Sequence, residues 1–188
     1  TIVDHSKIRS RAAAVKAVTK AIELAKKYGT RLYICHVSTK EELEIIKNAK
    51  NQGIKIYAEV TPHHLFLDES AYEKLGTLAQ MNPPLRTAAD CAALWQGISD
   101  GTIDTIGYDH APHTLEEKSQ PYPTSPSGVP GVETTLPLLL TAYRKGKISL
   151  EKIIELTHDN PQKIFNLLKN NDQIIVDMNL EKEVKNAN

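Results

Sequence analysis

Three short runs of β-branched and apolar residues alternate along the chain with segments of helical periodicity. Parallel strands are joined by crossover connections that are usually helices, so this alternation is typical of a parallel α/β sheet. The carboxyl ends of parallel strands lie at one edge of the sheet, where α/β proteins carry their functional groups. The three predicted strands are Arg31–Val37, Ile54–Val60 and Thr102–Tyr108.

The helices are predicted from apolar spacing and from residues that end helices. Ser38 or Thr39 can cap the second helix, and Gly29 ends the first. The segment between the second strand and Thr87 is expected to be irregular, and Ser119–Gly131 is a loop rich in Pro, Ser and Gly. The predicted helices are 10–27, 40–51, 87–99, 132–145, 149–157 and 161–169, followed by a short strand at 173–176. A complete α/β barrel takes about 250 residues, so these 188 residues form either a small open sheet or part of a larger barrel.

The composition indicates an ordinary globular protein, with 40% hydrophobic and 24% charged residues. Lys plus Arg equals Asp plus Glu at 23 each, so no basic surplus favours nucleic acid or an anionic membrane surface. No apolar run is long enough to cross a bilayer, and Thr1–Arg11 lacks the apolar core of a signal peptide. Cys35 and Cys91 suit a reducing compartment. We expect a cytoplasmic protein that binds neither nucleic acid nor membrane.

Imidazole and carboxylate side chains follow each predicted strand directly. This donor set suits zinc or a similar divalent ion, and a carboxylate that touches both a metal and its bound water can act as general base. Taken singly, each residue is also explained by structural hydrogen bonds or by helix capping. If the second strand continued through its histidine pair, at most one of the two would face the site. The residues are His36, His63, His64, Asp109, His110 and His113.

Two loops can present further polar groups to a ligand. Asn82–Arg86 is stiffened by two consecutive prolines, which can hold the Asn82 amide towards a ligand or simply form a structural turn. Ser127–Gly131 contains two glycines, so its backbone can approach a ligand closely, or it can serve as a flexible connection.

The motifs occur together in an order that resembles dihydroorotase of the long bacterial type, in the amidohydrolase superfamily. The resemblance runs from about His5 to Leu167. The segments that carry it are His36-Val37-Ser38-Thr39, Thr61-Pro62-His63-His64-Leu65, Asn82-Pro83-Pro84-Leu85-Arg86, Asp109-His110-Ala111-Pro112-His113-Thr114 and Ser127–Thr134.

The resemblance implies a (β/α)8 TIM-type barrel with a metal centre, of which this chain holds about strands six to eight with their helices. It implies zinc-dependent, reversible hydrolysis of L-dihydroorotate to N-carbamoyl-L-aspartate in pyrimidine biosynthesis. His36 and Asp109 are implied as zinc ligands, and Asp109 also as the catalytic residue that moves the proton. Asn82, His113 and the backbone at Gly128 are implied as substrate contacts.

The resemblance also predicts what lies outside the matched motifs. The remaining ligands of one or two zinc ions are expected before Thr1, so the chain alone is predicted neither to retain zinc tightly nor to turn over dihydroorotate. Residues 1–169 are predicted to be the carboxyl-terminal half of the barrel, and 170–188 the beginning of an accessory β segment. A homodimer is expected, with association with aspartate carbamoyltransferase as a further expectation.

Two alternatives remain open at this point. Another cyclic amide hydrolase, such as a hydantoinase or an allantoinase, would use similar chemistry, although the Asn82–Arg86 and Asp109–His113 motifs favour dihydroorotase. A non-catalytic dihydroorotase-like scaffold subunit would explain an incomplete set of metal ligands, whereas the intact His36, Asp109, Asn82 and His113 argue against it.

Overall fold

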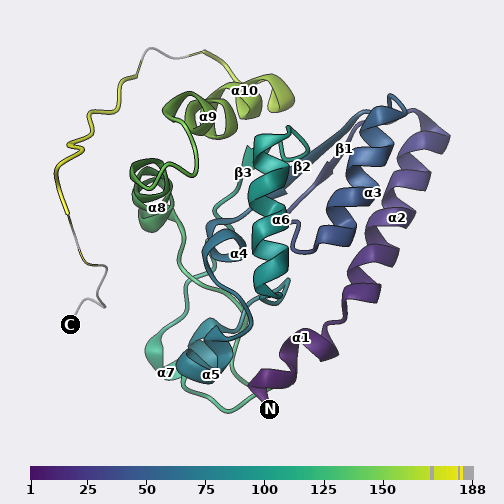
Figure 1. Cartoon of the computed structure of the whole chain (residues 1–188). Helices are drawn as coiled ribbons and strands as arrows, with labels where there is room; N and C mark the ends of the chain where they lie inside the picture. The colour runs from purple at the N-terminus through teal and green to yellow at the C-terminus, as the bar shows by residue number, and fades with distance from the viewer. Residues whose placement is uncertain (170–171, 182, 184–188) are drawn as a thin grey trace.

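A three-stranded parallel sheet forms the centre of the computed structural model, which describes residues 1–169, 172–181 and 183. The strands β1 (Leu32–Ile34), β2 (Ile56–Val60) and β3 (Thr105–Ile106) lie side by side in chain order, as Figure 1 shows. Their register pairs Leu32 with Ile56 and Glu59 with Thr105. The predicted α/β class and parallel order are therefore confirmed, and the strands are shorter than the apolar runs that predicted them.

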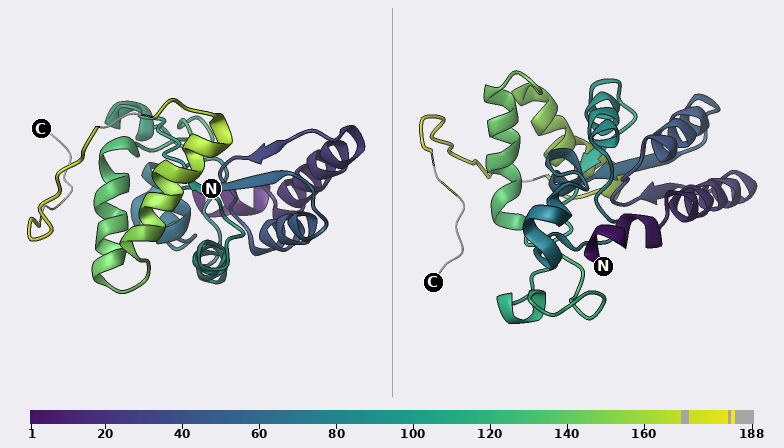
Figure 2. Two further views of the ribbon diagram at one scale, coloured as in Figure 1. Left: turned by 90° about the horizontal axis from the view of Figure 1, so that it is seen from above. Right: turned by 60° about the horizontal axis from the view of Figure 1, so that its bottom comes forward.

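Helices connect and flank these strands, and within the described residues none combines the length and apolarity that crossing a bilayer requires. Figures 1 and 2 show α2 beside β1, at one end of the strand order, and α8 with the helices after it beyond β3, at the other end. The α-helices are α1 (His5–Ile8), α2 (Arg11–Tyr28), α3 (Lys40–Asn51), α4 (Pro62–Phe66), α5 (Ala71–Leu75), α6 (Ala88–Ser99), α7 (Leu115–Lys118), α8 (Val132–Arg144), α9 (Leu150–Ile154) and α10 (Asn160–Phe165). Short 3-10 helices cover Ile2–Asp4 and Gly76–Ala79, and a π-helical turn, η3, covers Glu155–Asp159.

Local capping explains where the longer helices begin and end. The Ser10 hydroxyl accepts the Ala13 N–H at the start of α2, and Gly29 ends that helix with φ +64°. Thr39 and Glu42 form a reciprocal capping box on α3. These contacts lie within one turn of the helix end, which is why the sequence predicted the bounds of α3 correctly.

Two expectations about secondary structure are wrong. The stretch after β2 is not irregular, because Pro62 occupies the first turn of α4, a position that needs no backbone N–H, and α5 follows. Residues 173–176 form no strand. Within the described part of the chain they have no neighbouring strand to pair with, and residues 174–176 line a groove beside α8 instead. The accessory β segment at 170–188 falls partly outside the described residues and stays a prediction.

The apolar core lies between the sheet and the surrounding helices. Ala58 and Val60 of β2 are fully buried, as are Ile46 of α3, Leu139 of α8 and Leu156 of the π-helical turn. Each buried aliphatic side chain of this size contributes about 1.5–3 kcal/mol. The buried residues of β2 alternate along the strand, so one face of the sheet packs against the helices, and this packing fixes the positions of the strand ends.

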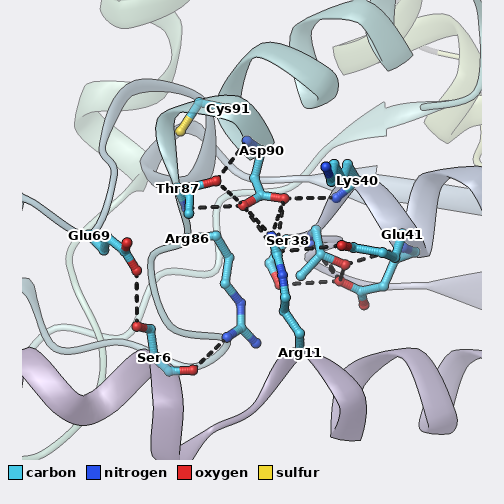
Figure 3. Close-up of polar contacts among 12 residues, drawn as sticks. Ser6, Arg11, Ser38, Lys40, Glu41, Glu69, Arg86, Thr87, Asp90 and Cys91 are labelled. Atoms are coloured by element: carbon cyan, nitrogen blue, oxygen red, sulfur yellow. Dashed lines mark hydrogen bonds and ion pairs between the residues drawn. The ribbon is translucent and has the colours of Figure 1, made fainter.

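A buried carboxylate, Asp90, joins three helices (Figure 3). Its oxygens accept hydrogen bonds from the Arg11 guanidinium, with the shortest distance 2.7 Å, and from the Lys40 backbone N–H at 3.0 Å. The Thr87 N–H and hydroxyl also donate to Asp90, which caps α6. Because Arg11 begins α2 and Lys40 begins α3, this one carboxylate connects the amino-terminal ends of α2, α3 and α6.

We predict that Asp90→Ala lowers the free energy of unfolding by about 1–3 kcal/mol, since the Lys40 and Thr87 N–H groups lose their acceptor and Arg11 keeps only the more distant Glu41 carboxylate, at 3.5 Å. Urea unfolding of the full chain measures the change. The matched control is Glu44→Ala, because Glu44 is an exposed carboxylate in the middle of α3. A loss for Asp90→Ala no larger than that for Glu44→Ala would contradict the structural role of this network.

Candidate active site

The two residues predicted as metal ligands follow β1 and β3 in the same unusual backbone conformation. His36 has φ +40° and Asp109 has φ +46°. Non-glycine residues with positive φ cost of order 1–3 kcal/mol and are concentrated at functional sites. Both strands end before these residues, so the left-handed turns direct the chain away from the sheet at its carboxyl edge.

His63 lies between these two residues, at the start of α4. Its Nε2 is 3.9 Å from Asp109 Oδ2, and this buried nitrogen makes no hydrogen bond within the described part of the chain. Burial lowers the pKa of His63 to about 4, with the Asp109 carboxylate opposing the shift and His36 adding to it. His63 is therefore neutral near pH 7, and it follows β2 as His36 follows β1 and Asp109 follows β3, so these groups lie at the ends of three neighbouring parallel strands.

His64 has a structural role. Its Nδ1 lies 2.7 Å from the Thr61 hydroxyl, and its Nε2 lies 3.0 Å from the Pro83 carbonyl oxygen. Burial holds the pKa of His64 well below its usual value. The premise that the strand continues through the pair is wrong, because α4 begins at Pro62; that only His63 of the pair faces the site stays a prediction.

Asn82 and His36 line the same cavity, which has a volume of about 300 Å³. The Asn82 side-chain oxygen is buried without a hydrogen-bond partner among the described residues, and the Asn82–Pro83 peptide bond is cis. Arg86 and the amino-terminal end of α2 form further parts of the wall. The structure thus brings a predicted metal ligand and a predicted substrate contact to one cavity.

His113 and Gly128 also lie next to each other. A Cβ atom placed on Gly128 would be 3.3 Å from His113 Nε2 and 2.6 Å from the Ala111 Cβ and carbonyl oxygen, and the φ of Gly128 is +144°. Only glycine fits this position. His110, by contrast, accepts the Gly131 N–H on its Nδ1 at 3.0 Å. This hydrogen bond joins the segment after β3 to the start of α8.

Sequence reasoning missed Glu59, the half-buried carboxylate that supports His36. Its carboxylate accepts the His36 backbone N–H at 3.1 Å and the Tyr33 hydroxyl at 2.8 Å. Gly107 of the neighbouring segment leaves room for this group, because a Cβ there would lie 2.2 Å from the Glu59 carboxyl carbon. The available signal was a carboxylate near the end of an otherwise apolar strand.

We predict that Gly107→Ala destabilises the chain by about 1–3 kcal/mol, because the added methyl group displaces the Glu59 carboxylate. Glu59→Ala alone leaves the His36 N–H without its acceptor and the Tyr33 hydroxyl with only the Thr105 hydroxyl as partner, at a similar cost. In the double variant the added methyl group no longer meets a carboxylate. The double variant should therefore lose less stability than the two single variants together, by about 0.5 kcal/mol or more.

Urea unfolding of the four proteins measures this coupling. Glu44→Ala combined with Gly107→Ala is the matched control, since Glu44 is exposed on α3, and these two changes should add. Additive losses for Glu59→Ala and Gly107→Ala would show that the two residues do not share this space.

The described residues do not complete a metal site. Across residues 1–169, 172–181 and 183, no three His, Cys, Asp or Glu side chains are grouped so that they could hold a metal ion. His36 and Asp109 supply nitrogen and oxygen donors of the kind that zinc accepts, but a zinc ion usually takes three or four protein ligands. The chemistry of the donors therefore fits a metal, whereas their number does not.

Comparison with known proteins supports the assignment of these motifs. No protein-family model matches the chain. Over 169 residues it is 44% identical to a dihydroorotase of Methanosarcina mazei, an alignment that covers 87% of this chain and 37% of that protein. The chain therefore spans well under half the length of the curated dihydroorotases that it matches.

Solved structures show the same fold. The dihydropyrimidinase of Brevibacillus agri NCHU1002 superposes with a TM-score of 0.82 at 30% identity, covering 87% of this chain and 37% of that one. The inactive dihydroorotase-like domain of the Chaetomium thermophilum CAD-like multifunctional protein gives 0.63 at 27% identity, covering 79% and 40%. This chain is thus homologous to dihydroorotases along most of its length, and it has the fold of part of an amidohydrolase barrel.

Proposed function

We propose that this chain forms part of the active site of a dihydroorotase, which interconverts L-dihydroorotate and N-carbamoyl-L-aspartate in pyrimidine biosynthesis. The observation that carries the proposal is the convergence of His36, His63 and Asp109 at the carboxyl ends of three parallel strands. The sequence identity to dihydroorotases selects this substrate among cyclic amides.

Asp109 is the proposed catalytic residue. It takes a proton from the attacking water and returns it to the amide nitrogen that leaves the ring. Its carboxylate is 36% exposed, so it remains accessible to water and substrate. The neutral His63 imidazole beside it adds no competing positive charge near pH 7.

His36 and Asp109 are the proposed contributions of this chain to a zinc site of one or two ions. When bound, zinc supplies a Lewis acid for the ring carbonyl and lowers the pKa of a water molecule. Since two protein ligands do not hold a closed site, we propose that the other ligands come from residues outside this chain.

Asn82, His113 and Gly128 are the proposed substrate contacts. Asn82 lines the cavity that it shares with His36, and its buried amide oxygen has no hydrogen-bond partner within the described residues. His113 would bind the substrate carboxylate, and the backbone at Gly128 would contact the ring. The partner is a small molecule; for the whole protein we propose a homodimer, and association with aspartate carbamoyltransferase as a further proposal.

Two other functions are favoured by specific structural neighbours. The likeness to a dihydropyrimidinase supports a different cyclic amide as substrate. The likeness to an inactive dihydroorotase-like domain supports a non-catalytic scaffold. One observation weighs against the scaffold, because a subunit without catalytic activity would not need to keep its site residues. This chain has all four of them: His36, Asp109, Asn82 and His113.

We predict that Asp109→Asn in the complete enzyme lowers kcat for L-dihydroorotate by at least about 100-fold, the lower range for removing a general acid–base. Its thermal unfolding should change little, since the side chain is partly exposed. Asp159→Asn, at a half-exposed carboxylate on the η3 turn, is the matched control and should keep normal turnover. Near-normal activity of Asp109→Asn would remove Asp109 from the proposed role.

A further inference from the structure

Lys118 is a buried cation without a carboxylate partner in the part of the chain that the structure describes. It ends α7, and only 5% of its surface is exposed. Burial lowers the pKa of its ammonium group, and no neighbouring charge opposes this effect. A lysine in such surroundings is costly unless its three N–H donors are all satisfied.

Three backbone carbonyl oxygens satisfy this ammonium group completely. Lys118 Nζ lies 2.8 Å from the Gln80 oxygen and 3.0 Å from the oxygens of Pro126 and Gly128. The three oxygens come from two segments that are far apart in the sequence. The ammonium group is therefore the point at which the loop after α7 is joined to the segment before Asn82.

Further hydrogen bonds run between the same two segments. The Gln80 carbonyl oxygen also accepts the Gly128 N–H at 2.9 Å, and the Gln80 side-chain amide donates to the Ser125 carbonyl oxygen at 2.7 Å. The Thr77 hydroxyl donates to the carbonyl oxygen of Lys118 itself at 2.6 Å. Lys118 thus lies at the centre of a network that sets the distance between Gly128 and Asn82.

We propose that Lys118 is a positioning residue for substrate binding. Its ammonium group holds the loop that carries Gly128 against the segment that carries Asn82, and it does not touch the substrate. The role in binding rests on the proposed function, which assigns Asn82 and Gly128 as substrate contacts. The joining of the two segments does not depend on that assignment.

The first test uses Lys118→Met in the full chain, because methionine has a similar length and no charge. Hydrogen exchange of the Gly128 amide, followed by NMR, should become at least about 10-fold faster, while amides of α3 keep their protection. Lys16→Met is the matched control, since Lys16 is exposed on α2. Unchanged protection of the Gly128 amide would overturn the proposal.

A second measurement needs no variant and so does not depend on how well Lys118→Met folds. The Lys118 ammonium protons of the unmodified chain should exchange slowly enough to give a resolved ¹⁵N-correlated signal near neutral pH. Exposed lysines lose this signal to rapid exchange with water. A Lys118 ammonium that exchanges as fast as that of Lys16 would overturn the proposal.

The third measurement addresses substrate binding in the complete enzyme. Lys118→Met should raise KM for L-dihydroorotate about 10-fold or more with a smaller change in kcat, because Asp109 is left in place. An unchanged KM would overturn the positioning role. If the unmodified enzyme does not turn over L-dihydroorotate, the proposed function fails, whereas the two exchange measurements still decide whether Lys118 joins the two segments.

Discussion

Parallel pairing of β1, β2 and β3 is the constraint on which the rest of the structure depends. Parallel strands end at the same edge, so His36, His63 and Asp109 meet there although they are far apart in the sequence. Helices packed on the buried face of the sheet hold the strands in place. The left-handed turns at His36 and Asp109 then direct the chain away from the sheet.

Buried or half-buried charged groups hold the loops around this edge. Glu59 supports the backbone of His36, Asp90 connects the beginnings of three helices, and Lys118 joins the loop of Gly128 to the segment before Asn82. Each of these groups bonds to backbone atoms of distant segments. Hydrophobic side chains could fill the same volumes but could not fix these hydrogen-bond directions, so the charges specify loop geometry more than they add to the core.

The sequence predicts those parts of the structure that depend on neighbours within one helical turn. The cap expected at Ser38 or Thr39 located the beginning of α3, where the structure uses Thr39, and the apolar runs located all three strands. The strand expected at 173–176 failed because pairing needs a partner strand, which local pattern does not supply. Glu59 and Lys118 were not predicted for a related reason, because their hydrogen-bond partners are distant in the sequence and are brought near only by the fold. The candidate site was located by motif, whereas its supports became visible only in three dimensions.

The central claim is that this strand edge serves a dihydroorotase and not another cyclic amide hydrolase. The most direct measurement is the relative kcat/KM of the protein that contains this chain for L-dihydroorotate, dihydrouracil and allantoin. The account predicts a strong preference for L-dihydroorotate, whose carboxylate His113 would recognise. Efficient hydrolysis of dihydrouracil or allantoin, with little on L-dihydroorotate, would contradict it.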